Sequence, residues 1–115
     1  MRVIVAGPRD FFDLKTVQGA INASGFHISE LVHGNATGVD ADAGYVAEMR
    51  GLPVKVFPAD WKTHGRAAGP IRNRQMAEYA QALVAIWDGK SRGTKNMIEQ
   101  AKKSMLKVYV HWINR

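Results

Sequence analysis

The sequence predicts an α/β fold: a Rossmann-like, three-layer αβα domain with a five-stranded parallel sheet in the order 3-2-1-4-5. Five short runs typical of strands alternate with four patterns typical of helices, and no repeat or linker interrupts the alternation. Strands separated by helices pair in parallel through right-handed crossovers. The length of 115 residues suits a domain with its own core, so we expect a single domain over residues 1–115.

The first half of the chain contains three of the predicted strands and two of the helices. The run RVIVA is short and rich in β-branched residues, which is typical of a buried central strand. Asp13 can cap the first helix, and Gly51 can end the second in a left-handed conformation. The predicted elements are a strand at 2–6, a helix from 13 to about 24, a strand at 26–33, a helix at 39–50 and a strand at 53–57.

The second half begins with an irregular stretch. Residues 58–69 have no apolar period and are longer than a usual connection, so we expect a functional loop or lid there. Pro70 then begins a third helix in the favoured first-turn position. A strand at 82–87, a helix ending near 104 and a strand at 106–112 follow. The last strand alternates apolar and polar residues, which indicates a sheet edge, and its Tyr109 and Trp112 suggest a homodimer.

Composition excludes several kinds of site. The chain has no cysteine, which excludes disulfides, thiol catalysis and cysteine-ligated metals. Its four histidines show no metal-ligand spacing, so we expect no metal site. The apolar runs are too short for a membrane span or a signal peptide, and we expect a cytoplasmic protein. The net charge is +6, and residues 62–95 carry seven basic residues against two acids. This excess favours an anionic partner, although a solvated basic face is the alternative.

Three loops that contain glycine follow predicted strands one, two and four, and these loops meet at the carboxyl edge of the sheet. Their backbone N–H groups and hydroxyls suit a phosphate or a ribose, and ordinary turn geometry is the alternative for each glycine. The loop at 88–96, between a strand and a helix, has the strongest pattern; its alternative is a plain turn with Thr94 as N-cap. The predicted contacts in the loops are Gly7, Arg9, Asp10, Gly34, Asn35, Ala36, Thr37, Gly38, Lys90, Ser91, Arg92, Gly93 and Thr94.

Five further residues complete the candidate site. Asp40 can complement a helix dipole or accept a ribose hydroxyl, and Asp88 can contact the ligand or pair with Arg72 or Arg92. Arg72 and Arg74 lie in the first turns of a helix, where a positive charge is unfavourable unless an anion compensates it. Trp61, in the long loop, is the candidate for base stacking. Asp88 and Arg72 are the candidates for catalysis.

Five segments in chain order resemble the YspA, cpYpsA-related SLOG family: 5–11, 34–40, 58–61, 68–74 and 87–94. The resemblance covers nearly the whole chain. It implies a Rossmann-like fold, a relationship to the DNA-processing protein DprA and to the LOG phosphoribohydrolases, and binding of a nucleotide or nucleotide-derived ligand. Such members occur in bacteria and phages. No cofactor is expected to be required.

The chain departs from these relatives at three points, the first of which is Pro8, where the family commonly has Ser. The family's second loop usually reads Gly-Gly-Ala-Arg-Gly, whereas this chain has Gly-Asn-Ala-Thr-Gly at 34–38. Asn96 stands where the LOG enzymes carry their catalytic Glu, and an amide cannot act as a general base. We therefore expect a binding or sensing protein and not a LOG-type enzyme. The alternatives are a hydrolase of a nucleoside monophosphate or related N-glycoside, and a DprA-like binder of single-stranded nucleic acid.

Overall fold

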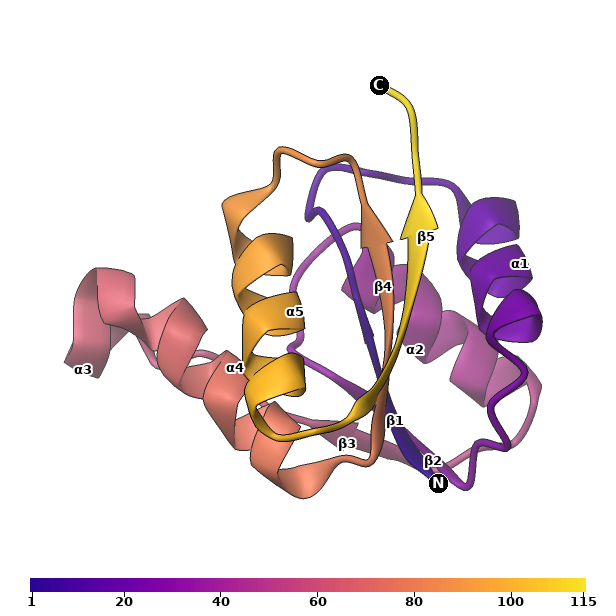
Figure 1. Ribbon diagram of the computed structural model, residues 1–115, viewed down its shortest axis with the longest axis horizontal. Coiled ribbons are helices and arrows are strands. Elements are labelled where there is room, and N and C mark those ends of the chain that lie inside the picture. Colours follow the sequence, from indigo (N-terminus) through magenta and orange to yellow (C-terminus); the bar gives the residue numbers. More distant parts are fainter.

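The computed structural model describes residues 1–115 and has the predicted three-layer αβα architecture (Figure 1). Five parallel strands form one sheet in the order β3-β2-β1-β4-β5. The strands are β1 (Arg2–Ala6), β2 (Glu30–His33), β3 (Val54–Val56), β4 (Ala82–Trp87) and β5 (Lys107–Trp112). The α-helices are α1 (Leu14–Ser24), α2 (Val39–Met49), α3 (Trp61–His64), α4 (Ala68–Tyr79) and α5 (Arg92–Lys103), and η1 (Gly65–Ala67) is a 3₁₀ helix.

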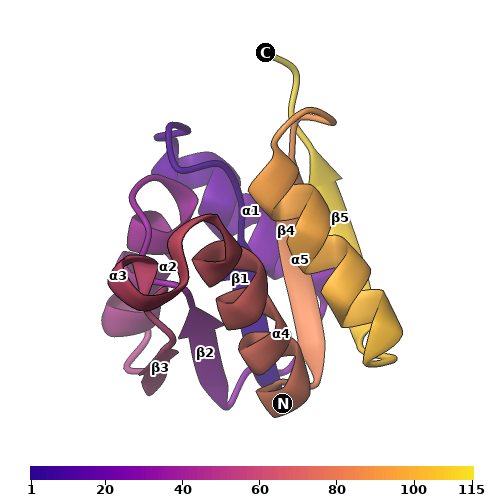
Figure 2. The same ribbon diagram turned by 90° about the vertical axis from the view of Figure 1, so that its left-hand side faces the viewer.

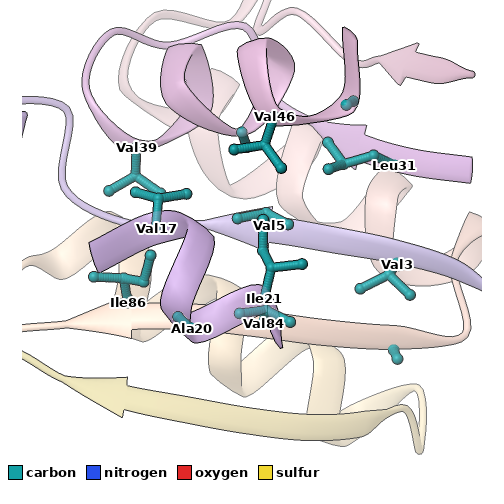
Figure 3. Close-up of a cluster of buried hydrophobic side chains, with 13 residues drawn as sticks. Val3, Val5, Val17, Ala20, Ile21, Leu31, Val39, Val46, Val84 and Ile86 are labelled. Atoms are coloured by element: carbon teal, nitrogen blue, oxygen red, sulfur yellow. The ribbon is translucent and has the colours of Figure 1, made fainter. Parts of the chain in front are cut away.

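Two buried clusters hold helices against the two faces of the sheet. On one face, residues of α1 and α2 pack against Val3, Val5, Leu31 and Val84 (Figure 3). On the other face, α4 and α5 pack against alternate residues of the same strands, as Figure 1 shows from the side. This alternation of side chains along each strand explains why the two clusters are separate. The packing leaves the carboxyl ends of the strands uncovered.

The second strand is shorter than predicted. The expected strand covered residues 26–33, but β2 begins at Glu30, and this prediction was wrong at its start. The reason is the length of its neighbour: β1 begins at Arg2, which pairs with Glu30, so the preceding residues have no strand beside them. Ser29 instead donates its N–H to the carbonyl of Met1, at 2.9 Å.

The segment at 58–69 is more ordered than predicted. Asp60 caps α3 by accepting the N–H of Thr63 at 3.2 Å, and η1 leads directly into α4. α4 begins at Ala68, so Pro70 is its third residue and not its first; the missing N–H has no intrahelical partner at either position. The prediction of an irregular loop was therefore wrong. α3 extends away from the sheet, beyond α4 (Figure 1).

The outer edge of β5 is partly apolar, as predicted. Trp112 is 63% exposed and its ring lies 5.1 Å from that of Trp87, whereas Tyr109 is half-buried. Self-association through this edge stays a prediction. None of the helices is long and apolar enough to cross a membrane.

Candidate functional site

A cleft of about 1070 Å³ opens at the carboxyl edge of the sheet. The loops after β1, β2 and β4 contribute to it, together with α3, α4 and the start of α5 (Figure 2). This is the edge at which the sequence predicts a site, at the point where the strand order reverses between β1 and β4. The predicted residues that line the cleft are Gly7, Arg9, Asp10, Ala36, Asp40, Trp61, Arg72, Asp88, Lys90, Ser91, Arg92, Gly93 and Thr94.

The start of α5 presents unpaired backbone donors to this cleft. Ser91 is the N-cap residue, but its side chain makes no capping hydrogen bond, and the first turn contains no acidic residue. The N–H groups of Arg92, Gly93 and Thr94, the first three residues of the helix, have no acceptor in the protein. A Cβ added to Gly93 would meet no atom within 4 Å, so this position is open. A helix start of this kind attracts an anion.

Asp88 organises the loop before α5. Its carboxylate accepts the N–H groups of Ser91 at 2.7 Å and Lys90 at 2.8 Å, and the Nε–H of Arg115 at 3.0 Å. These hydrogen bonds, that of Ser91 most of all, lower the pKa of Asp88 from 3.8 to about 2 although burial opposes them. The side chain is only 5% exposed. The predicted partners, Arg72 and Arg92, do not contact it: Arg115 is the partner.

Arg115 also reaches the loop after β1. Its Nη2 donates to the Asp10 carboxylate at 2.6 Å, so one guanidinium joins Asp10 to Asp88 across the mouth of the cleft. The hydrogen bond from Arg115 lowers the pKa of Asp10. Two of the carboxylates in the cleft thereby share the single positive charge of Arg115. No local pattern in the sequence points to this residue, because it lies 27 residues from Asp88.

The loop after β2 uses its first N–H groups within the protein. Asp40 accepts those of Gly34 and Ala36, at 3.1 and 3.2 Å, and the Nδ1 of His33 accepts that of Asn35 at 3.0 Å. The sequence suggested that these three donors hold a phosphate. In the structure they are already used within the protein. Asp40 is 6% exposed, and burial raises its pKa above the ordinary value although the N–H of Ala36 opposes this effect. The carboxylate of Asp40 therefore stabilises the conformation of this loop.

Close packing explains three of the predicted glycines. A Cβ on Gly7 would lie 2.6 Å from Val39 Cγ2, and one on Gly34 would lie 2.1 Å from Arg72 Nη1. Gly38 has φ +69, and a Cβ there would lie 2.5 Å from the carbonyl oxygen of Pro8. Gly34 and Gly38 lie outside the cleft lining, whereas Gly7 lines it. Gly7 and Gly38 thus allow the loop after β1 to lie close to the start of α2, and Gly34 allows the Arg72 guanidinium of α4 to approach the loop after β2.

Arg72 connects the loop after β2 to the start of α5. Its Nη1 donates to the carbonyl oxygen of Gly34 at 2.5 Å, and its Nε donates to Asn73 Oδ1 at 2.9 Å. The Nδ2 of Asn73 donates in turn to Asn96 Oδ1 at 3.0 Å and to the carbonyl oxygen of Gly93 at 3.3 Å. Burial lowers the pKa of Arg72 from its ordinary value. Arg72 thus has a structural role, and Asn96 is a polar cleft residue held by Asn73.

The remaining predicted residues divide between the cleft and its surroundings. Trp61 is 50% exposed, and the guanidinium of Arg9 lies 5.9 Å from the centre of its ring. Arg74 does not line the cleft: it is exposed and forms an i,i+4 ion pair with Glu78 at 3.9 Å. Asn35 and Thr37 line a smaller pocket of about 340 Å³ beside the cleft.

Sequence reasoning did not select Arg66, Asn73 or Arg115, all of which line the cleft. For two of them the sequence contained a feature that could have indicated a site. Arg66 belongs to the basic stretch from 62 to 95, and Asn73 lies between Arg72 and Arg74 in one of the segments that resemble the SLOG family. Arg115 follows the last strand by three residues, and only the strand order brings that position beside the loop after β4.

Comparisons with known proteins agree with this fold and with the expected family. The model of the YspA, cpYpsA-related SLOG family matches residues 1–64. The gene 61 protein of Mycobacterium phage D29 is 33% identical over 117 residues, covering 93% of both chains. The crystal structure of DNA processing protein A (DprA) from Streptococcus pneumoniae has the same fold, with a TM-score of 0.75 and 20% identity over 95% of this chain. This chain spans 49% of the DprA chain. The protein therefore belongs to the YspA, cpYpsA-related SLOG family.

Proposed function

We propose that the protein binds a nucleotide or a nucleotide-derived small molecule in the cleft. The observation that carries this proposal is the start of α5, where three N–H groups without acceptors open into the cleft. A phosphate there would accept these hydrogen bonds and complement the helix dipole. Lys90 and Arg92 are exposed beside these donors and would add charge.

The charges in the cleft support an anionic ligand. Six basic side chains line it, against the carboxylates of Asp10, Asp40 and Asp88. Arg115 pairs with two of these acids, and the third holds the loop after β2. Arg9, Arg66, Lys90 and Arg92 form no ion pair in the protein, so their charge is available to a ligand. The half-exposed ring of Trp61 would stack on a base.

Isothermal titration calorimetry with nucleoside monophosphates, ADP-ribose and NAD tests the proposal. We expect at least one of them to bind, and Arg92→Ala to weaken that binding by about tenfold, the loss of roughly 1.4 kcal/mol. Arg74→Ala is the matched control, because it removes the same charge from the same face outside the cleft. Binding by none of these compounds, or an equal loss in both variants, would contradict the proposal.

The carboxylates support binding more than hydrolysis. A general base must accept a proton, but Asp88 already accepts three hydrogen bonds and its pKa is about 2. Asn96 contributes an amide and cannot replace it. We therefore expect no release of free base from nucleoside monophosphates, as monitored by chromatography. Release that is lost in Asp88→Asn would instead support the hydrolase.

Single-stranded nucleic acid is the second candidate ligand. Arg66, which lines the cleft, and Lys62 and Lys95, which do not, are all exposed. The structurally similar DprA is named as a DNA processing protein. Fluorescence anisotropy with a labelled single-stranded oligonucleotide would distinguish the two ligands. A nucleic-acid binder loses affinity with salt at a log–log slope of about −0.7 per phosphate contact. If the site instead takes a small ligand, the affinity for the oligonucleotide should depend only weakly on salt. A free nucleotide should then displace the oligonucleotide.

A further inference from the structure

The smaller pocket lies directly beside the cleft. The two cavities share four lining residues: Arg9, Ala36, Trp61 and Arg72. The other walls of the smaller pocket are the loop at 34–37 and residues 58–59. Arg9 and Trp61, which lie against each other, therefore stand between the two cavities. A ligand that passed this pair would gain about 340 Å³ of further space.

The smaller pocket has the chemistry of a site for a polar or anionic group. Two guanidinium groups line it and no carboxylate does. The N–H of Thr37 has no acceptor in the protein, and neither does Nη2 of Arg72. The side-chain amide of Asn35 forms no hydrogen bond within the protein either. Donors of this kind suit the hydroxyls of a sugar or the oxygens of a phosphate.

The anion site at α5 and the smaller pocket belong to one connected framework. Arg72 contacts Gly34, which lines the smaller pocket, and through Asn73 it is joined to the carbonyl of Gly93 in the first turn of α5. Thr37 Oγ1 donates to the carbonyl oxygen of Arg9 at 2.7 Å and so fixes the loop that bounds the pocket. The two binding regions are thus held at a fixed separation, as a ligand with two polar ends requires.

We infer that the smaller pocket is a second subsite of the same ligand, and that the ligand is a nucleoside diphosphate joined to a sugar or to a second nucleoside. One phosphate lies at the start of α5, and the group beyond the diphosphate enters the smaller pocket. A nucleoside monophosphate fills only the cleft. The inference rests on the proposed function, since it requires a nucleotide in the cleft.

Matched series of ligands test this subsite by calorimetry. Each series keeps one base and adds first a phosphate and then a sugar: AMP, ADP and ADP-ribose; GMP, GDP and GDP-mannose; UMP, UDP and UDP-glucose. We expect the sugar-bearing member of at least one series to bind about tenfold more tightly than its diphosphate, a gain of roughly 1.4 kcal/mol. The comparison with the diphosphate separates the sugar from the charge of the added phosphate.

Two variants alter the smaller pocket, one by filling it and one by removing a donor, at residues that do not line the cleft. Ala59 lines the pocket but not the cleft, so Ala59→Trp should remove the advantage of the sugar-bearing ligand and leave the diphosphate unchanged. Asn35→Gly removes the free amide at a φ of +61, which glycine adopts readily, and should reduce the same advantage. Ala23→Trp, on the exposed side of α1, is the control. Circular dichroism confirms that each variant folds.

The outcomes separate the two proposals. Equal affinity for the diphosphate and its sugar conjugate in every series would overturn the second subsite and leave the nucleotide site intact. An advantage that both Ala59→Trp and Asn35→Gly retain would also overturn it. Absence of binding by all nine compounds would contradict the proposed function and, with it, this inference.

Discussion

Replacing Asp88 by Asn should destabilise the protein at neutral pH and much less in acid. The substitution keeps an oxygen for the N–H groups of Lys90 and Ser91 but removes the charge that pairs with Arg115. The folded pKa of about 2 lies below the ordinary 3.8, so the ionised form stabilises the fold at pH values above 3.8, and this contribution is lost as the pH falls toward 2.

The magnitude follows from the same values. A shift from 3.8 to about 2 corresponds to roughly 2.4 kcal/mol at most. The Arg115 side chain is 33% exposed, and solvent screening reduces the expected loss to about 1–2 kcal/mol at pH 7. At pH 3, midway through the transition, about half of this difference should remain.

Urea unfolding of the wild type and the variant at pH 7 and pH 3 measures both values. Asp10→Asn is the matched control, because Asp10 pairs with the same guanidinium but is 72% exposed, and its effect should be smaller. An equal loss at both pH values would refute the reasoning, since the effect would then not depend on the charge of Asp88. An Asp10 variant as unstable as the Asp88 variant would refute the assigned difference in burial.

Three further predictions concern Gly34, Trp61 and Asp40. Gly34→Ala would place a Cβ 2.1 Å from Arg72 Nη1 and should lower the free energy of unfolding in urea by about 1–3 kcal/mol. The control is Gly19→Ala in the middle of α1, where a Cβ would meet no atom within 4 Å. This change should raise the free energy of unfolding by about 0.5–1 kcal/mol. Equal effects of the two changes would show that the close approach of Arg72 is irrelevant. Trp61→Ala should weaken nucleotide binding by about 1–3 kcal/mol with little change in stability, because the ring is 50% exposed; unchanged affinity would exclude stacking. Because burial raises the pKa of Asp40, its ionisation lowers the stability of the fold as the pH rises from 3.8 through the folded pKa. Asp40→Asn should therefore flatten the pH dependence of the urea midpoint above pH 4. An unaltered dependence would argue against a raised pKa of Asp40.

The order and direction of the strands could be predicted because they depend on a regular alternation that the sequence displays directly. The ends of the elements depend on neighbours that the local sequence does not contain. β2 starts at the residue that pairs with the first residue of β1. α4 starts before Pro70 because it directly continues the helical segments α3 and η1. Asp60 is a residue type that favours the N-cap position and it caps α3, but a helix of four residues is too short to show an apolar period in the sequence.

The position of the candidate site could be predicted, since parallel strands bring their carboxyl ends to one edge. The partners within it could not. Asp88 pairs with Arg115 across 27 residues, and Asp40 takes up N–H groups that a glycine loop would otherwise present to a ligand. A glycine in the sequence does not reveal whether its backbone approaches a ligand or another loop. Gly38 and Gly93 differ in this respect: the first packs against Pro8 and the second is open.

The two sides of the cleft therefore differ in how freely they can change during evolution. The side formed by the loops after β1 and β2 is held by close contacts of Gly7, Gly34 and Gly38 with Val39, Arg72 and Pro8, so most substitutions at these glycines would disturb the fold. The side formed by Lys90 and Arg92 consists of exposed side chains on a helix start whose donors belong to the backbone. Mutation can alter these side chains and retain the backbone donors of the proposed anion site. New ligand preferences should arise on that side, while the glycine side preserves the architecture.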